Sequence, residues 1–309
     1  MRIKILGSAA GGGFPQWNCN CRNCRFSREG SLRSKPRTQT QVAICQDNRA
    51  WFLLNASPDL RTQIEATPVL HPRNHGRNSP IGGVLLTSGD IDQVAGLLSL
   101  RELQRFRIYC TLSIRRILQE DNSLFAMLNR VPDQVSWTDI GCDGNFCLQA
   151  LPERGAGINC SVFSLGNRFP AYVSRERVAS LKQEDALLGV IATSSAGKRF
   201  AYLAAVPVVD DSLLERLEEA DLLLFDGTFW SDDELIRVQG SGSTAREMGH
   251  IPVSGAEGSL RKLAGLQKPR KIFVHVNNTN PMLDESGPEY AEVRAAGWEV
   301  AEDDWSLEL

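Results

Sequence analysis

Short apolar runs of strand length recur along the whole 309-residue chain, and amphipathic stretches of helix length lie between them. Runs rich in Val, Ile, Leu and Phe indicate strands, and apolar residues spaced by three and four indicate helices. Strands are predicted at residues 2–6, 41–45, 51–55, 83–87, 107–110, 146–151, 161–165, 188–193, 200–205, 221–225, 271–276 and 298–301. Helices are predicted at residues 91–103, 112–118, 212–219, 256–266 and 288–296. This order predicts an α/β fold in which two mixed β-sheets pack together with helices outside, an αββα sandwich.

The composition is that of a folded globular protein. Apolar residues make up 42% of the chain and charged residues 23%, which is close to the usual mix. No Pro-, Gly- or Ser-rich linker and no internal repeat divides the sequence. We therefore expect a single domain over residues 1–309, long enough to bury a sizeable core.

The charge and hydropathy patterns argue against two classes of partner. The 34 basic and 37 acidic residues give a formal net charge of −3, without a long block of Lys and Arg, so a phosphate-tracking surface is not expected. No apolar run approaches the roughly 20 residues that span a bilayer, and Met1-Arg2-Ile3 leads directly into a predicted strand instead of a signal peptide. We expect a cytoplasmic protein whose partners are neither nucleic acid nor membrane.

Three of the eight cysteines are clustered within residues 18–24. Cys19, Cys21 and Cys24 lie among polar residues, whereas most of the others lie in or beside strand-like runs, as small buried hydrophobic residues do. In a chain without an export signal the thiols are expected to be reduced. Because Zn²⁺ takes about four N or S ligands, the cluster predicts a zinc knuckle whose fourth ligand comes from elsewhere in the fold. The alternative is chance clustering in a surface loop.

Polar side chains follow three of the predicted strands. Asp90 and Asp92 follow the strand at residues 83–87, Asp226 follows the strand at 221–225, and His275 lies near the end of the strand at 271–276. The carboxyl ends of neighbouring strands converge in α/β proteins, so these four side chains are expected to share a cleft. Carboxylates and an imidazole suit a non-haem iron or a catalytic zinc. The alternative for Asp90 and Asp92 is that they cap the helix that begins at Ile91.

His250 is a further candidate, in a loop that follows the glycine-rich residues 240–242. Its imidazole could act as an acid or base, or orient a substrate, because its ordinary pKa lies near neutrality. A purely structural role in the loop is the alternative.

Several segments spread over the chain form a distinctive set of motifs. They are residues 6–21, 55–59, 96–102, 225–228 (Phe225-Asp226-Gly227-Thr228), 248–250 and 275–281 (His275-Val276-Asn277-Asn278-Thr279-Asn280-Pro281). In these segments the chain resembles the pyrroloquinoline quinone (PQQ) biosynthesis protein B family, a branch of the metallo-β-lactamase superfamily. The resemblance implies an αββα fold, a structural Zn²⁺ at the cysteine knuckle and a role in making the redox cofactor PQQ. It also implies that the fourth zinc ligand lies near His275 or Asn278.

The chain departs from the hydrolases of this superfamily after the strand at 83–87. Those hydrolases have His-x-His-x-Asp-His, whereas this chain has Ser88-Gly89-Asp90-Ile91-Asp92-Gln93 and keeps only the last Asp. A dinuclear zinc hydrolase is therefore not expected. Relatives often carry His at the position of Gln93, and a neutral Gln binds iron poorly. Asp92 and His275 remain as a core pair of iron ligands, with Asp90 and Asp226 as further oxygen donors.

Two functions follow from the resemblance. The first is an Fe²⁺-dependent oxygenase, a hydroxylase that oxidises the tyrosine ring of a cross-linked Glu–Tyr precursor, with Asp92, His250 and His275 as catalytic residues. The second is a non-catalytic protein that binds or transports PQQ or its precursor, with a degraded metal site and Arg101 or Arg246 as carboxylate partners. Other proteins of the PQQ pathway are candidate partners in either case.

Overall fold

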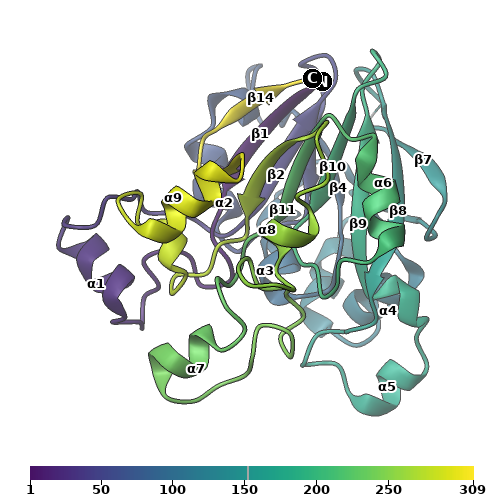
Figure 1. Ribbon diagram of the computed structural model, residues 1–309. Coiled ribbons are helices and arrows are strands. Elements are labelled where there is room, and N and C mark those ends of the chain that lie inside the picture. The colour runs from purple at the N-terminus through teal and green to yellow at the C-terminus, as the bar shows by residue number, and fades with distance from the viewer. Residues whose placement is uncertain (152) are drawn as a thin grey trace. The chain divides into compact units, whose positions relative to one another are not determined.

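The computed structural model describes residues 1–151 and 153–309, which fall into two compact units. The first unit comprises Met1–Leu6, Gln41–Lys198 and Asp304–Leu309, and the second comprises Gly7–Thr40 and Arg199–Asp303. The strands of the chain form two seven-stranded sheets, and the helices are distributed through both units (Figure 1). That the chain is a single domain stays a prediction.

The first unit contains one whole sheet, with the strand order β14-β1-β2-β3-β4-β5-β6. Its strands are β1 (Arg2–Gly7), β2 (Gln41–Cys45), β3 (Trp51–Leu54), β4 (Ile81–Leu85), β5 (Phe106–Cys110), β6 (Val135–Asp139) and β14 (Ser306–Glu308). β14 pairs with β1 and β2 with β3 in the antiparallel sense, whereas β3 to β6 run parallel. The two chain ends lie side by side (Figure 1), where the backbone N–H of Leu309 donates to the carbonyl of Met1 at 2.9 Å.

The first unit also holds three antiparallel strands and several short helices. These are β7 (Asn145–Leu148), β8 (Ile158–Gly166), β9 (Leu187–Thr193), α2 (Leu60–Glu65), α3 (Ile91–Val94), α4 (Leu112–Gln119) and α5 (Arg175–Ala179). Helix α4 begins where the hydroxyl of Thr111 accepts a hydrogen bond from the backbone N–H of Ile114 at 3.3 Å. Its residues Ile114, Ile117 and Leu118 share one face and pack into the apolar core of this unit.

The second unit is built on four parallel strands. They are β10 (Arg199–Leu203), β11 (Leu222–Asp226), β12 (Arg270–Val274) and β13 (Trp298–Val300), and the helices of this unit are α1 (Arg22–Arg28), α6 (Asp211–Glu218), α7 (Glu234–Gln239), α8 (Ser259–Lys262) and α9 (Pro288–Ala295). Asp226, at the end of β11, lies opposite Val274, at the end of β12. Because parallel strands end at the same edge, the residues that follow Asp226 and Val274 are brought together there.

Two predicted helices are shorter than the sequence indicated. The stretch at 91–103 is the four-residue α3 followed by a 3₁₀-helix, Ala95–Arg101. Gly96 lies there so close to the backbone of Ala56 and Ser57 that a Cβ would meet the Ser57 carbonyl oxygen at 2.1 Å. The stretch at 256–266 is helical only in α8, which starts directly after Gly258. Apolar periodicity was present in both stretches, but tight packing at glycines interrupts the α-helical backbone.

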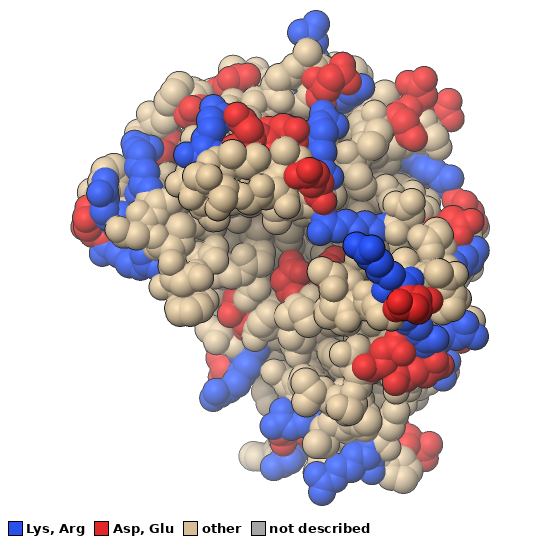
Figure 2. Space-filling view, turned by 90° about the horizontal axis from the view of Figure 1, so that it is seen from below, with Lys and Arg blue, Asp and Glu red and all other residues tan. Residues whose placement is uncertain are grey.

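The surface carries charges of both signs. On the face in Figure 2, Lys and Arg side chains are interspersed with Asp and Glu. Among the helices of residues 1–151 and 153–309, none combines the length and the apolar character needed to cross a bilayer.

Candidate metal centres

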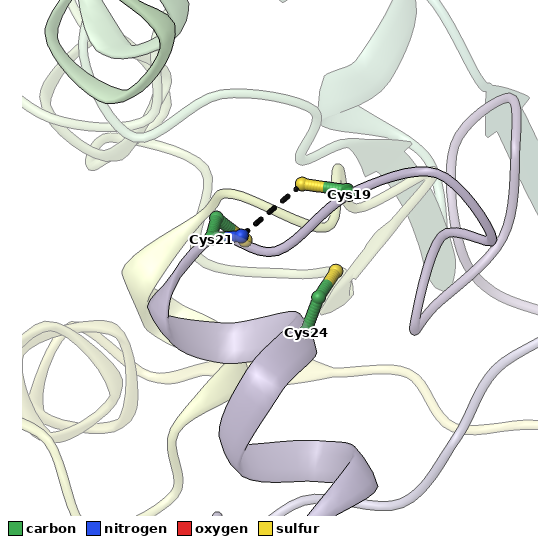
Figure 3. Close-up of side chains that lie close together, drawn as sticks. All are labelled: Cys19, Cys21 and Cys24. Carbon is green, nitrogen blue, oxygen red and sulfur yellow. Dashed lines mark hydrogen bonds between the residues drawn. The ribbon is translucent and has the colours of Figure 1, made fainter.

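The three clustered cysteines converge at the start of helix α1 (Figure 3). The sulfur atoms of Cys19, Cys21 and Cys24 all lie within 4.8 Å of one another. Cys21 directly precedes α1, and Cys24 lies fully buried in its first turn. The backbone N–H of Cys21 points at the sulfur of Cys19 at 3.4 Å. The start of the helix therefore holds three sulfur donors around one small space.

Asn278 lies over these three sulfurs from the other end of the sequence. Its side-chain nitrogen is 3.1 Å from Cys19 Sγ, 3.7 Å from Cys21 Sγ and 3.3 Å from Cys24 Sγ. The side chain of Asn23 in α1 donates to the carbonyl oxygens of Asn278 and Asn280, at 3.1 and 2.9 Å. These bonds tie α1 to the segment after β12, where the amide of Asn278 donates hydrogen bonds toward the three sulfurs.

The thiols of this cluster influence one another's ionisation. Burial raises the pKa of Cys21 to about 12, and negative charge on Cys19 and Cys24 acts in the same direction. Burial also acts to raise the pKa of Cys19, but hydrogen bonds from Cys21, Cys24 and Asn278 outweigh it and lower that pKa. Three thiolates at these distances repel one another, and a bound cation would relieve the repulsion.

A second cluster lies at the ends of β11 and β12. It consists of Asp226, His250 and His275, whose nearest ligand atoms lie within 4.8 Å of one another, and all three are buried. Nδ1 of His250 is 2.8 Å from Oδ2 of Asp226. The rings of His250 and His275 are stacked with centroids 5.3 Å apart. The structure thus places His250, a further candidate from the sequence, beside Asp226 and His275, two of the four residues expected in one cleft.

Thr228 is the residue that connects this cluster. Its hydroxyl oxygen is 2.6 Å from Asp226 Oδ1, 3.1 Å from His250 Nδ1 and 2.8 Å from His275 Nδ1. Between Asp226 and Thr228, a Cβ on Gly227 would lie 2.8 Å from atoms of Phe273 and Met282. Sequence reasoning missed Thr228 as a site residue, although the polar sequence at the end of β11 contained the signal.

Asp226 is held in place on both carboxylate oxygens. Oδ2 accepts the backbone N–H of Val206 at 2.8 Å, and Oδ1 accepts that of Thr228 at 3.0 Å. Burial alone would raise the pKa of Asp226, but the imidazoles of His250 and His275 and the hydroxyl of Thr228 lower it. The buried carboxylate is therefore ionised and faces two imidazoles.

His275 has a left-handed backbone, with φ of 57°. Non-glycine residues seldom adopt this conformation, and in folded proteins it is concentrated at functional sites. It occurs directly after β12, where the chain turns away from the strand. This turn presents the imidazole to Thr228 and Asp226.

Asp90, Asp92 and Gln93 belong to the first unit, so their predicted convergence with Asp226 and His275 stays a prediction. Asp90 occupies the position before α3, and its Oδ2 accepts the hydroxyl of Ser88 at 2.9 Å. The side-chain oxygen of Gln93 accepts the hydroxyls of Thr87 at 2.9 Å and Ser88 at 3.1 Å. Gln93 thus organises neutral hydroxyl groups where hydrolases of the superfamily have imidazoles.

The fold and the positions of these clusters define the class of protein. Residues 50–276 match the family described as the Beta-lactamase superfamily domain. A diphosphatase from the PhnP family shares the fold, with a TM-score of 0.67 at 18% identity over 100% of this chain and 97% of that one. The predicted αββα fold is confirmed as a metallo-β-lactamase fold.

Closer relatives identify the branch. Coenzyme PQQ synthesis protein B of Methylobacterium radiotolerans is 43% identical over 314 residues, and that of Pseudomonas aeruginosa is 42% identical over 310, each over 100% of both chains. The crystal structure of Zn²⁺-bound PqqB from Methylobacterium extorquens covers 100% of both chains with a TM-score of 0.91 and 42% identity. The chain belongs to the coenzyme PQQ synthesis protein B family, and the resemblance predicted from its motifs is confirmed.

Proposed function

We propose that Cys19, Cys21 and Cys24 hold a structural Zn²⁺, with Asn278 at the fourth position. The observation that carries this proposal is the convergence of three sulfurs within 4.8 Å beneath one amide side chain. The set suits Zn²⁺, which prefers four ligands in a closed structural site. A relative of 42% identity was crystallised with Zn²⁺, which supports the choice of ion. The ion would fasten α1 to the segment after β12.

We propose further that the chain takes part in PQQ synthesis as an Fe²⁺-dependent oxygenase that hydroxylates the tyrosine ring of a Glu–Tyr precursor. The observation that carries this proposal is the cluster of Asp226, His250 and His275, because two imidazoles and one carboxylate form the ligand set of many non-haem iron oxygenases. Bound Fe²⁺ would supply O₂ activation beside the precursor. The protein's part is to fix the donors and to limit the access of water to them.

This assignment changes the predicted role of His250. A lone pair that binds iron cannot also accept the phenolic proton, and the ligand atom of His250 lies within 4.8 Å of those of Asp226 and His275. Asp226 and Thr228 both contact Nδ1 of His250 and so fix the orientation of its ring. We therefore propose His250 as a ligand and Thr228 as the residue that positions both imidazoles. Asp90 and Asp92 remain proposed oxygen donors.

The test is an oxygenation assay under controlled conditions. Zinc-loaded protein receives Fe²⁺, precursor and ascorbate without oxygen and is then exposed to O₂, and the precursor is analysed by mass spectrometry. Ascorbate supplies the two electrons that convert the second atom of O₂ to water when one oxygen atom is inserted. The proposal predicts one or two added oxygen atoms in the parent and none in His275→Ala. Equal oxygenation by the parent and His275→Ala would contradict the site.

The carrier function is favoured by one specific observation, the hydrogen bonds of Gln93 with Thr87 and Ser88. The resemblance implies that relatives often carry His at this position. A carrier would bind the precursor or PQQ without changing it. If Gln93→His gains oxygenation while the parent binds the precursor and shows none, the carrier function is the correct one.

A further inference from the structure

A cavity of about 550 Å³ lies in the second unit beside the beginnings of α1 and α7. Its volume is in the range that holds an amino acid or another small ligand. The lining residues are Cys21, Arg22, Asn23, Trp230, Ser231, Glu234, Arg237, Val238, Ser254, Thr279, Pro281 and Glu289. Asp226, His250 and His275 are not among them, so this cavity is separate from the proposed iron cluster.

Glu234 is the buried charged group of this cavity. Its residue is only 5% exposed. The backbone N–H of Trp230 donates to Oε2 at 2.6 Å, and the hydroxyl of Thr279 donates to Oε1. These two neutral donors orient the carboxylate without neutralising its charge. Burial accordingly raises the pKa of Glu234 to about 7.

The arginines and the glutamates that line the cavity differ in their ion pairs. Arg22 is paired with Asp284 at 3.1 Å, and Arg237 is paired with Asp233 at 2.8 Å. In the described part of the chain, neither Glu234 nor Glu289 has a Lys or Arg within ion-pair distance. The cations that line the cavity thus form ion pairs with Asp284 and Asp233, and the charge of Arg237 acts on Glu234 from beyond ion-pair distance.

We propose that this cavity binds the primary ammonium group of a small amino-acid-like ligand, with Glu234 as its counter-ion. An ammonium group would neutralise the buried carboxylate, whose uncompensated charge is costly in a low-dielectric site. Glu289 supplies a second negative charge. The half-buried ring of Trp230, which lines the same cavity, offers a surface on which a cation is attracted. This inference does not depend on the oxygenase proposal.

The experiment compares two probes that differ at the α-nitrogen. L-tyrosinamide carries an ammonium group there, and N-acetyl-L-tyrosinamide has a neutral amide in its place. Each is titrated into the full-length zinc-loaded protein at pH 7.5 and followed by calorimetry and ligand-observed NMR. We expect the first probe to bind at least about tenfold more tightly, as for a charge-assisted contact in a buried site. Equal affinity, or no binding of either probe, would overturn the proposal.

Variants locate the ligand. Glu234→Gln keeps the shape of the side chain and is expected to lower the affinity for tyrosinamide at least about tenfold. Glu289→Gln is expected to lower this affinity less. The matched control is Glu257→Gln, a surface carboxylate paired with Lys262 outside the cavity, which should bind as the parent does. Unchanged affinity in a folded Glu234→Gln variant overturns the assignment. If that variant does not fold, unchanged affinity in Glu289→Gln overturns it.

Two further measurements test where the probe binds and which kind of ammonium group the cavity prefers. His275→Asn alters the proposed iron cluster and is expected to leave tyrosinamide affinity unchanged. Loss of binding in that variant would show that the probe binds at the iron cluster. This result would overturn the proposal, whatever the oxygenation assay shows. A peptide with acetylated and amidated ends and a single lysine tests whether the cavity instead binds the ammonium group of a protein side chain. If the peptide binds more tightly than tyrosinamide, the assignment to an amino-acid-like ligand is wrong.

Discussion

At the scale of single residues, the second cluster depends on one hydroxyl group. Thr228 is 2% exposed and contacts Asp226, His250 and His275 through the same oxygen. A side chain that contacts several metal ligands fixes their orientation. Loss of such a contact commonly lowers the affinity for the metal by about ten- to a hundredfold. The ends of β11 and β12 fix the backbone positions of Asp226 and His275. Thr228 fixes the orientation of their side chains.

Thr228→Val should therefore lose Fe²⁺ affinity by about ten- to a hundredfold while keeping the shape of the side chain. An anaerobic Fe²⁺ titration of the zinc-loaded protein measures the effect. Thr228→Ser restores the hydroxyl and is the matched control, expected to bind iron nearly as the parent does. Parent-like affinity in the valine variant would show that the hydroxyl does not position the ligands.

Gln93 is the second residue whose substitution has a clear expected result. Gln93→His removes one acceptor for the hydroxyls of Thr87 and Ser88, both of which are buried. Each hydroxyl keeps a second acceptor, Asn55 for Thr87 and Asp90 for Ser88. The expected cost is therefore that of a neutral hydrogen bond, about 0.5–1.5 kcal/mol. Urea unfolding should show a decrease of this size, with Gln239→His at an exposed position as control. Unchanged stability would mean that the imidazole accepts the same hydrogen bonds.

At the scale of elements, helix α1 is short and has few apolar contacts of its own. Only Asn23 and Cys24 of its residues are buried. Isolated helices of this length are not stable in water, so tertiary contacts must hold it. The cysteine cluster and the bonds from Asn23 to Asn278 and Asn280 provide those contacts.

Cys21→Ser should therefore release the zinc and lower the free energy of unfolding by several kcal/mol, because the binding energy of a structural zinc is also folding energy. Elemental analysis and thermal unfolding measure the two effects. Cys142→Ser, in the first unit, is the matched control and should keep one zinc per chain. A Cys21→Ser protein with the parent's zinc content and melting temperature would rule out the knuckle as a metal site.

Helix α7 carries a pH-dependent element in Glu234. Its pKa is raised from 4.5 to about 7 by burial, so between these values the folded chain holds a proton that the unfolded chain has released. Stability contributed by the protonated side chain is fully present below pH 4.5 and is lost as the pH rises through 7. The loss amounts to as much as about 3 kcal/mol at 1.36 kcal/mol per pKa unit.

Glu234→Gln should remove this decrease. Free energies of unfolding measured from pH 5 to pH 8 should fall less steeply in the variant than in the parent. Parallel curves for the two proteins would show that Glu234 does not titrate in this range. The control is Glu257→Gln, whose side chain is at the surface.

At the scale of the whole molecule, much of the fold was predictable because apolar runs mark buried strands directly. Strand β2 was predicted with its observed bounds, and β9 and β12 to within two residues. Helices α1 and α7 were not predicted, because α1 contains few apolar residues and α7 is only six residues long. Tertiary contacts and the cysteine cluster determine the conformation of these helices. Neither produces a periodic pattern of apolar residues in the sequence.

The candidate site was predictable in part for a similar reason. Asp226 and His275 lie at strand ends, where the topology brings polar residues together, and Cys19, Cys21 and Cys24 lie within six consecutive residues. The contact of His250 with Asp226 depends on the path of a long loop, and Glu234 is a site residue only because the chain folds a cavity around it. Neither relation has a signature in sequence spacing.

The whole chain is also expected to lack hydrolase activity. Ser88, Asp90 and Gln93 replace the imidazoles that hold two metals and activate water in the hydrolases of this superfamily. Zinc-loaded protein should not turn over a generic phosphodiester or a β-lactam above background in a colorimetric assay. Clear turnover that Asp92→Ala abolishes would contradict this expectation.

The central claim is that the second unit holds two different metals at two separate clusters. Anomalous X-ray diffraction at the zinc and iron absorption edges, from one crystal grown anaerobically with both ions, tests it most directly. We expect a zinc peak among Cys19, Cys21 and Cys24 and an iron peak among Asp226, His250 and His275. An iron peak at the cysteines, or no iron peak at the second cluster, would contradict the claim.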